Sequence, residues 1–159
     1  MLKRRLIPKL QMKASSFGKS SRMVLVTTRQ FTEVIEIGDP VSQAKIYEAQ
    51  AADELIFVDL DASSQYRLAA VDVVRQAAEE IFMPITVGGG VRSLEDFRVL
   101  LNNGADKVSI NTAAVEIPDL INQASAAFGT QCVVLSIDYR KNNDGKYYVC
   151  IRGGREKTD

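Results

Sequence analysis

The chain has 159 residues, and its 20 Lys and Arg side chains balance 20 Asp and Glu side chains. With 46% hydrophobic and 25% charged residues, the composition is that of a globular protein and excludes a disordered or collagen-like chain. Because there is no histidine, Ser–His and Cys–His catalytic pairs and the usual zinc sites are excluded, so any acid–base chemistry falls to carboxylates, lysines or tyrosines.

Charge and cysteine content also indicate the setting in which the protein works. A net charge of zero gives no support for a nucleic-acid-binding surface. Cys132 and Cys150 are too few for a disulfide framework and favour a reducing compartment. No apolar run approaches the roughly 20 residues of a membrane span, and the basic start is followed only by the short stretch Leu6-Ile7-Pro8. We therefore expect a soluble, cytoplasmic protein without membrane or nucleic-acid partners.

Short apolar runs alternate with segments of helical spacing along most of the chain. The runs predict buried strands at Leu6–Met12, Glu54–Leu60, Ile85–Val87, Lys107–Ile110 and Cys132–Ile137. The spacing of apolar residues predicts helices at Val41–Ala52, Ala70–Ile81, Leu94–Leu101 and Leu120–Phe128. Such alternation is typical of an α/β fold with a parallel sheet built from βαβ units.

An open doubly wound sheet and a (β/α)8 barrel both fit this pattern. A complete barrel takes about 250 residues, so on the second interpretation residues 1–159 are one partial TIM-barrel domain. It would hold about half a barrel, with four βα units and a fifth strand.

Two segments interrupt the alternation, and one helix has clear end signals. The first connection, residues 13–38, is long and polar, then rich in β-forming residues from Met23. Residues 141–159 form a tail in which a turn precedes Lys146–Ile151, predicted as one arm of a hairpin. The helix at Leu94–Leu101 is predicted to be capped by Ser93 with Asp96.

A glycine triplet, Gly88, Gly89 and Gly90, lies between a predicted strand and this capped helix. Backbone N–H groups without side chains approach an oxyanion closely, and the following helix adds a favourable dipole. Asn111 and Thr112 end the next strand and can donate to the same anion. The alternative is that the glycines only permit a tight turn and that Asn111 caps a loop.

Seven motifs occur in an order that resembles the N-terminal part of the cyclase subunit of imidazole glycerol phosphate synthase, from Met1 to about Tyr147. They are Leu6-Ile7-Pro8, Gly38-Asp39-Pro40, Ala52-Asp53-Glu54-Leu55, Asp59-Leu60-Asp61-Ala62-Ser63, the run from Thr86 to Ser93, the run from Gly104 to Thr112, and Ser136-Ile137-Asp138. The resemblance implies a (β/α)8 barrel that takes ammonia from a glutaminase partner and uses it to cleave and cyclise a phosphorylated substrate. It also favours the phosphate interpretation of the glycine triplet.

The resemblance implies two catalytic aspartates, at the ends of strands one and five. Asp138 keeps the second place, but Gln11 stands in the first, and a glutamine amide neither gives nor takes a proton at neutral pH. A lysine of the family's first loop falls on Thr27, with Lys19 nearby. Lys9 shares a strand face with Gln11, and we predict it as a further catalytic residue because its long stem could reach the place where Gln11 replaces the aspartate. Inside a barrel it must pair with a carboxylate or have a lowered pKa, and otherwise it reaches solvent along its stem.

The resemblance also implies a charged gate for ammonia at the floor of the barrel. Arg5, Glu54 and Lys107 are its matching residues, although charges at strand starts are common on ordinary surfaces. No cofactor is expected. The Asp59-x-Asp61 pair supplies too few oxygens for a hard cation, so no metal is expected either.

Three functions remain open at this point. The first is a cyclase-like subunit with altered catalytic residues, which works with a glutaminase on a phosphorylated small molecule. The second is a relative that passes ammonia to another acceptor, as in nucleotide-sugar or surface-polysaccharide synthesis. The third is a non-catalytic half-barrel. Unpaired edges at strands one and five would favour association of two copies, unless the tail at Lys146–Ile151 covers one edge.

Overall fold

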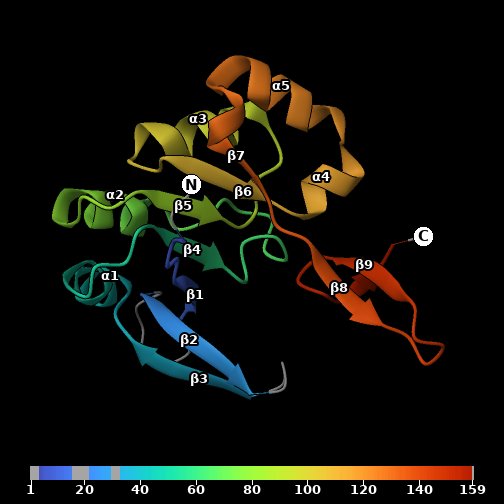
Figure 1. Cartoon of the computed structure of the whole chain (residues 1–159), viewed down its shortest axis with the longest axis horizontal. Helices are drawn as coiled ribbons and strands as arrows, with labels where there is room; N and C mark the ends of the chain where they lie inside the picture. The colour runs from blue at the N-terminus through green and yellow to red at the C-terminus, as the bar shows by residue number, and fades with distance from the viewer. Residues whose placement is uncertain (1–3, 16–21, 30–32, 159) are drawn as a thin grey trace.

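Five parallel strands form the main part of a seven-stranded sheet in the computed structural model, which describes residues 4–15, 22–29 and 33–158. The sheet order is β3-β2-β1-β4-β5-β6-β7 (Figure 1). The parallel strands are β1 (Lys9–Ala14), β4 (Leu55–Asp59), β5 (Ile85–Gly88), β6 (Lys107–Ile110) and β7 (Val133–Leu135). This mixed α/β arrangement confirms the predicted class and is consistent with a partial (β/α)8 barrel.

Helices follow the strands and cover one face of the sheet (Figure 1). The four longer ones are α1 (Pro40–Ala49), α2 (Val71–Glu80), α3 (Leu94–Asn102) and α5 (Asp119–Phe128). Alternate strand residues such as Leu55, Phe57 and Val108 point to this face and are fully buried against helix residues such as Val74 and Phe97. The core therefore lies between the sheet and its helices, and the predicted helices are confirmed to within a few residues at their ends. None of the helices in the described ranges combines the length and apolarity that a membrane span requires.

The opposite face of the sheet is more polar. Lys9 and Lys107 lie on it in one row. In the parallel register Lys9 pairs with Ile56, Ile56 pairs with Thr86, and Thr86 pairs with Lys107. Gln11 lies one pleat further along β1, next to Val58. This is the face that would line the inside of a barrel.

The first connection contains a hairpin that the sequence did not resolve. Strands β2 (Met23–Arg29) and β3 (Glu33–Gly38) pair with each other, and β2 pairs antiparallel with β1. The β-rich character predicted from Met23 onward is confirmed. The edge of β1 is consequently covered from Gln11 to Ala14, which corrects the expectation of an open edge for that part of the strand. The association of two copies stays a prediction.

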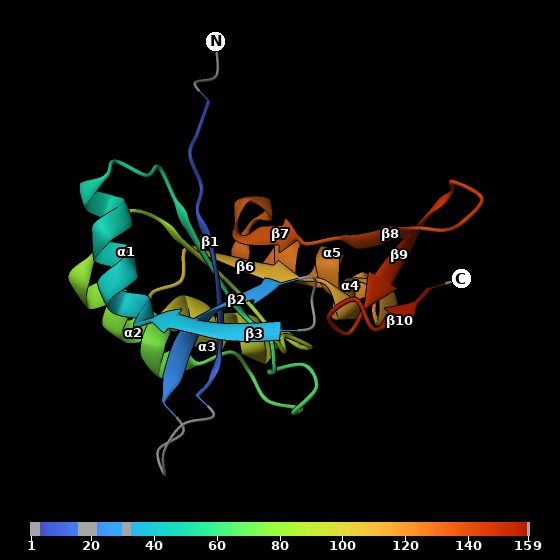
Figure 2. The same cartoon turned by 90° about the horizontal axis from the view of Figure 1, so that it is seen from below.

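The tail forms a separate small sheet rather than covering an edge. It consists of β8 (Asp138–Lys141), β9 (Tyr147–Ile151) and β10 (Glu156–Lys157), with β9 in the middle. The turn at residues 142–146 holds β8 and β9 together, since Lys146 N–H donates to Asn142 Oδ1 over 2.8 Å. Pairing across so short a loop costs little chain entropy. Figure 2 shows this small sheet on the side of the molecule away from α1 and α2.

Two helices begin at side-chain caps. Ser93 Oγ accepts from Asp96 N–H, and the Asp96 carboxylate accepts from Ser93 N–H, so the predicted cap of α3 is confirmed as a capping box. At α1, Asp39 Oδ1 accepts from Ser42 N–H over 2.8 Å, and Asp39 Oδ2 accepts from Arg22. The Ser42 N–H and the Arg22 guanidinium lower the pKa of the Asp39 carboxyl.

Replacing Asp39 with alanine is expected to lower the free energy of unfolding by about 1 kcal/mol, the usual value of an N-cap. Asp39→Asn keeps the capping oxygen and loses only the charge. Because the folded-state pKa is lowered, the charge stabilises the fold above the ordinary value of 3.8 and stops doing so as the pH falls through the lowered value. Urea unfolding should therefore show the wild-type and Asp39→Asn curves converging in acid. A difference that does not change with pH would contradict the assignment.

Candidate functional site

A buried carboxylate lies between two basic side chains at the amino ends of the parallel strands. Glu54 directly precedes β4, is 7% exposed, and forms an ion pair with Arg5 through one oxygen. Its other oxygen accepts from Lys107 Nζ, at the start of β6, over 2.7 Å. The structure thus brings together the three residues expected at the ammonia gate, and their role as a gate stays a prediction.

The glycine triplet lies at the carboxyl end of β5, at the opposite end of the parallel strands from this cluster. Gly89 and Gly90 have φ of 123° and 70°, a backbone conformation that residues other than glycine rarely adopt. A Cβ on Gly90 would lie 1.9 Å from the carbonyl oxygen of Arg67. The tight-turn interpretation therefore has direct steric support. The N–H of Gly90 donates to Ser63 Oγ over 3.3 Å, and anion binding stays a prediction.

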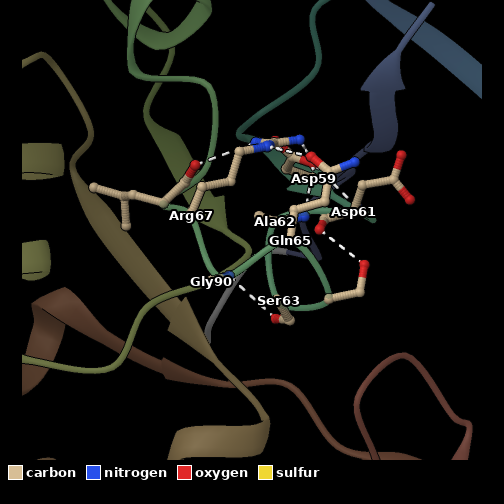
Figure 3. Close-up of polar contacts among 9 residues, drawn as sticks. Asp59, Asp61, Ala62, Ser63, Gln65, Arg67 and Gly90 are labelled. Atoms are coloured by element: carbon tan, nitrogen blue, oxygen red, sulfur yellow. Dashed lines mark hydrogen bonds and ion pairs between the residues drawn. The ribbon is translucent and has the colours of Figure 1, made fainter.

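A turn after β4 packs against the glycines, and an ion pair between a buried aspartate and a half-buried arginine holds it (Figure 3). The Asp59 side chain is completely buried and accepts from the N–H groups of Asp61 and Ala62. Arg67 contacts both oxygens of Asp59, with 3.1 Å between Nη2 and Oδ1. The sequence indicated Asp59 as the start of a family motif and as half of a possible metal pair, but not as the partner of Arg67. An aspartate at the end of a buried strand is typical of such a side-chain-to-backbone turn, and that signal could have identified it.

Asn111 and Thr112 contact the small sheet at the carboxyl end of β6. Asn111 Nδ2 donates to Asp138 Oδ2 over 3.0 Å, and Thr112 Oγ accepts from Arg152 N–H over 3.0 Å. Thr112 also begins a short helix, α4 (Thr112–Glu116), which the sequence did not predict. The Arg152 guanidinium donates to Glu116, and this contact raises the pKa of Arg152.

The position of Asp138 corrects the predicted fifth strand. Strand β7 ends at Leu135, and Asp138 is the first residue of β8, opposite Cys150 in the small sheet. The chain leaves the parallel sheet because residues 138–141 pair with β9 instead of continuing beside β6. Asp138 nevertheless lies against Asn111, so an expected acid–base residue contacts an expected phosphate residue.

Gln11 and Lys9 lie far along the sheet from Asp138. Strands β4, β5 and β6 separate β1 from β7. Gln11 is half-buried and lies between Val58 and Val26 in the sheet. Lys9 is exposed and has no ion pair with any residue in the described ranges. In this structure the lysine therefore reaches solvent, which was one of the two alternatives for it.

Among the described residues, the remaining candidates for catalysis or metal binding form no further cluster. Thr27 lies on β2 and is exposed, and Lys19 lies outside the described residues. Within the described ranges, no three Cys, Asp or Glu side chains gather in a way that could hold a metal ion.

Known proteins match the chain over nearly all of its length. The family described as histidine biosynthesis protein matches residues 5–159. The chain is 50% identical over its whole length to the imidazole glycerol phosphate synthase subunit HisF of Exiguobacterium sp.. It is 49% identical to a putative subunit hisF2 of Prochlorococcus marinus and 48% identical to the HisF subunit of Lactococcus lactis subsp. cremoris. It spans 59%, 61% and 58% of these three relatives. With this match, the fold and the ordered motifs in agreement, the chain belongs to the histidine biosynthesis protein family.

Proposed function

We propose that the chain carries part of a cyclase subunit of imidazole glycerol phosphate synthase, in which ammonia from a glutaminase reacts with a phosphorylated substrate. The observation that carries this proposal is the identity of about half of all residues, over the full chain, to subunits with that name. The two ends of the parallel strands have distinct chemistry, which suits entry of ammonia at one end and reaction at the other.

The Glu54 cluster is the proposed entry for ammonia. One carboxylate there faces two cations, Arg5 and Lys107, so the cluster keeps a net positive charge. Such a charge repels ammonium more than neutral ammonia. The glutaminase is therefore proposed to bind around the amino ends of the strands.

The carboxyl ends are the proposed place of reaction. Asn111 has two amide hydrogens, so one can hold Asp138 while the other donates to a phosphate. The hydroxyl of Thr112, which accepts from Arg152, still has its proton for the same anion. Phosphate at Gly88, Gly89 and Gly90 would then lie beside Asp138, which is the proposed acid–base group.

A second candidate function follows from Gln11. Because this amide cannot exchange a proton, residue 11 offers no carboxylate to the proposed site, and the nearest titratable groups along β1 are Lys9 and Lys13, each two residues away. This difference favours a relative that delivers ammonia to a different acceptor. A non-catalytic half-barrel has no comparable observation in its favour.

The test is turnover of the cyclase substrate with glutamine plus glutaminase, and separately with ammonium salt. Asp138→Asn is expected to lower both rates by about 100-fold, the usual contribution of a general acid or base. Glu54→Gln should lower only the glutamine-dependent rate, because dissolved ammonia does not need the entry. Glu95→Gln, at an exposed carboxylate of α3, is the control and should change neither rate.

Two outcomes separate the candidates. Binding of the glutaminase without turnover of the cyclase substrate would favour delivery to another acceptor. A chain that neither binds the glutaminase nor turns over the substrate would contradict the proposal.

A further inference from the structure

The Ser63 hydroxyl lies against the backbone N–H that the proposed function assigns to phosphate. Gly90 N–H donates to Ser63 Oγ over 3.3 Å (Figure 3). Arg92 Nη2 donates to the Ser63 carbonyl oxygen over 2.8 Å. A serine hydroxyl has two lone pairs and one proton. Among the described residues, no hydrogen bond uses that proton, so it remains available to a ligand.

The loop that carries Ser63 is fixed on both sides. On one side, the buried Asp59 holds Ala62 N–H and the Arg67 guanidinium, and Arg67 N–H donates to the Ala62 carbonyl over 3.0 Å. On the other side, Ala69 N–H donates to the Gly89 carbonyl over 3.0 Å. Ser63 is therefore held beside Gly90 by contacts that need no ligand, which is the preorganisation that a binding site requires.

Positive charge lies close to the same point. The Arg92 guanidinium that contacts Ser63 lies over the Tyr66 ring, 4.8 Å from its centroid. A hydroxyl with a free proton, a backbone N–H and a guanidinium are the donors that anionic phosphate oxygens accept from.

We propose that Ser63 is a further binding residue for the terminal phosphate of the substrate. In the structure its oxygen occupies the acceptor position of Gly90 N–H. When a phosphate monoester binds, one phosphate oxygen accepts the hydrogen bond from Gly90 N–H. The Ser63 hydroxyl then rotates and donates to a second phosphate oxygen. This inference rests on the proposed function, because it uses the same glycine turn.

The experiment is a titration of the isotope-labelled 159-residue chain with inorganic phosphate, followed through the amide signals of Gly90 and Thr112. Ser63→Ala is expected to weaken binding by about 10-fold, the effect of losing a hydrogen bond to a charged group. Ser63→Thr keeps the hydroxyl and should retain the affinity. Ser64→Ala is the matched control, since that neighbouring hydroxyl donates to the Asp61 carbonyl and points to no ligand.

Urea unfolding of each variant shows whether a loss of phosphate affinity comes from a loss of folded protein. Ser63→Cys provides a second removal of the hydroxyl with little change in size. Equal phosphate affinity in wild type, Ser63→Ala and Ser63→Cys would overturn this inference alone. An equal loss in Ser64→Ala would overturn it too. No response of Gly90 or Thr112 in the wild type would overturn the phosphate site of the proposed function, and this inference with it.

Discussion

Gly90→Ala is expected to lower the free energy of unfolding by about 3 kcal/mol or more, as overpacking adds to left-handed backbone strain. The new Cβ would lie 1.9 Å from the Arg67 carbonyl oxygen, far inside contact distance. The backbone at Arg67 cannot easily shift away, because the Arg67 side chain forms an ion pair with the buried Asp59.

Gly153→Ala is the matched control for this effect. Gly153 has φ of 71°, almost the same as Gly90, but a Cβ there would meet nothing within 4 Å. Its expected cost is about 1 kcal/mol, from the backbone conformation alone. Urea unfolding of both variants measures the difference, and equal costs would show that the contact with Arg67 relaxes without penalty.

Asp59→Ala is expected to cost about 3 kcal/mol, since it leaves the half-buried Arg67 guanidinium without its partner. It also leaves the N–H groups of Asp61 and Ala62 without an acceptor. Asp59→Asn keeps an oxygen for those two groups and should cost less. The stability lost in Asp59→Asn therefore measures the ion pair, and the further loss in Asp59→Ala measures the hydrogen bonds of the turn.

The control is Asp61→Ala, in the same turn. The Asp61 carboxylate has no ion pair among the described residues, so removing it is expected to change stability by no more than about 0.5 kcal/mol. Chemical unfolding monitored by circular dichroism measures all three variants. A cost for Asp61→Ala as large as that for Asp59→Ala would mean that the turn, and not the buried pair, is what the fold depends on.

The sequence predicted those features that short-range patterns encode. Helix α3 has both its apolar spacing and its Ser93–Asp96 cap within a few residues, so its start was predictable to the residue. The cluster of Arg5, Glu54 and Lys107 was expected from the family resemblance, and it agrees with the rule that parallel strands begin at one end of the sheet.

Features that depend on competition between distant segments were not predictable in this way. Whether residues after Leu135 continue beside β6 or turn to pair with β9 depends on two sheets competing for the same strand. The Asp59–Arg67 pair depends on the path of an irregular loop, which no periodicity reveals. The contact of Asn111 with Asp138 follows only once the small sheet is placed against β6.

The antiparallel pairing of β2 with β1 has a consequence for barrel closure. In a closed barrel of parallel strands, each strand has a parallel neighbour on both sides. Here β1 has β4 on one side, while β2 occupies the other side from Gln11 to Ala14. An incoming parallel strand would have to displace β2 from these four positions or pair only with the start of β1. Closure by a strand that pairs with these four positions would therefore be a strand exchange, in which each hydrogen bond gained by the incoming strand is offset by one that β2 loses.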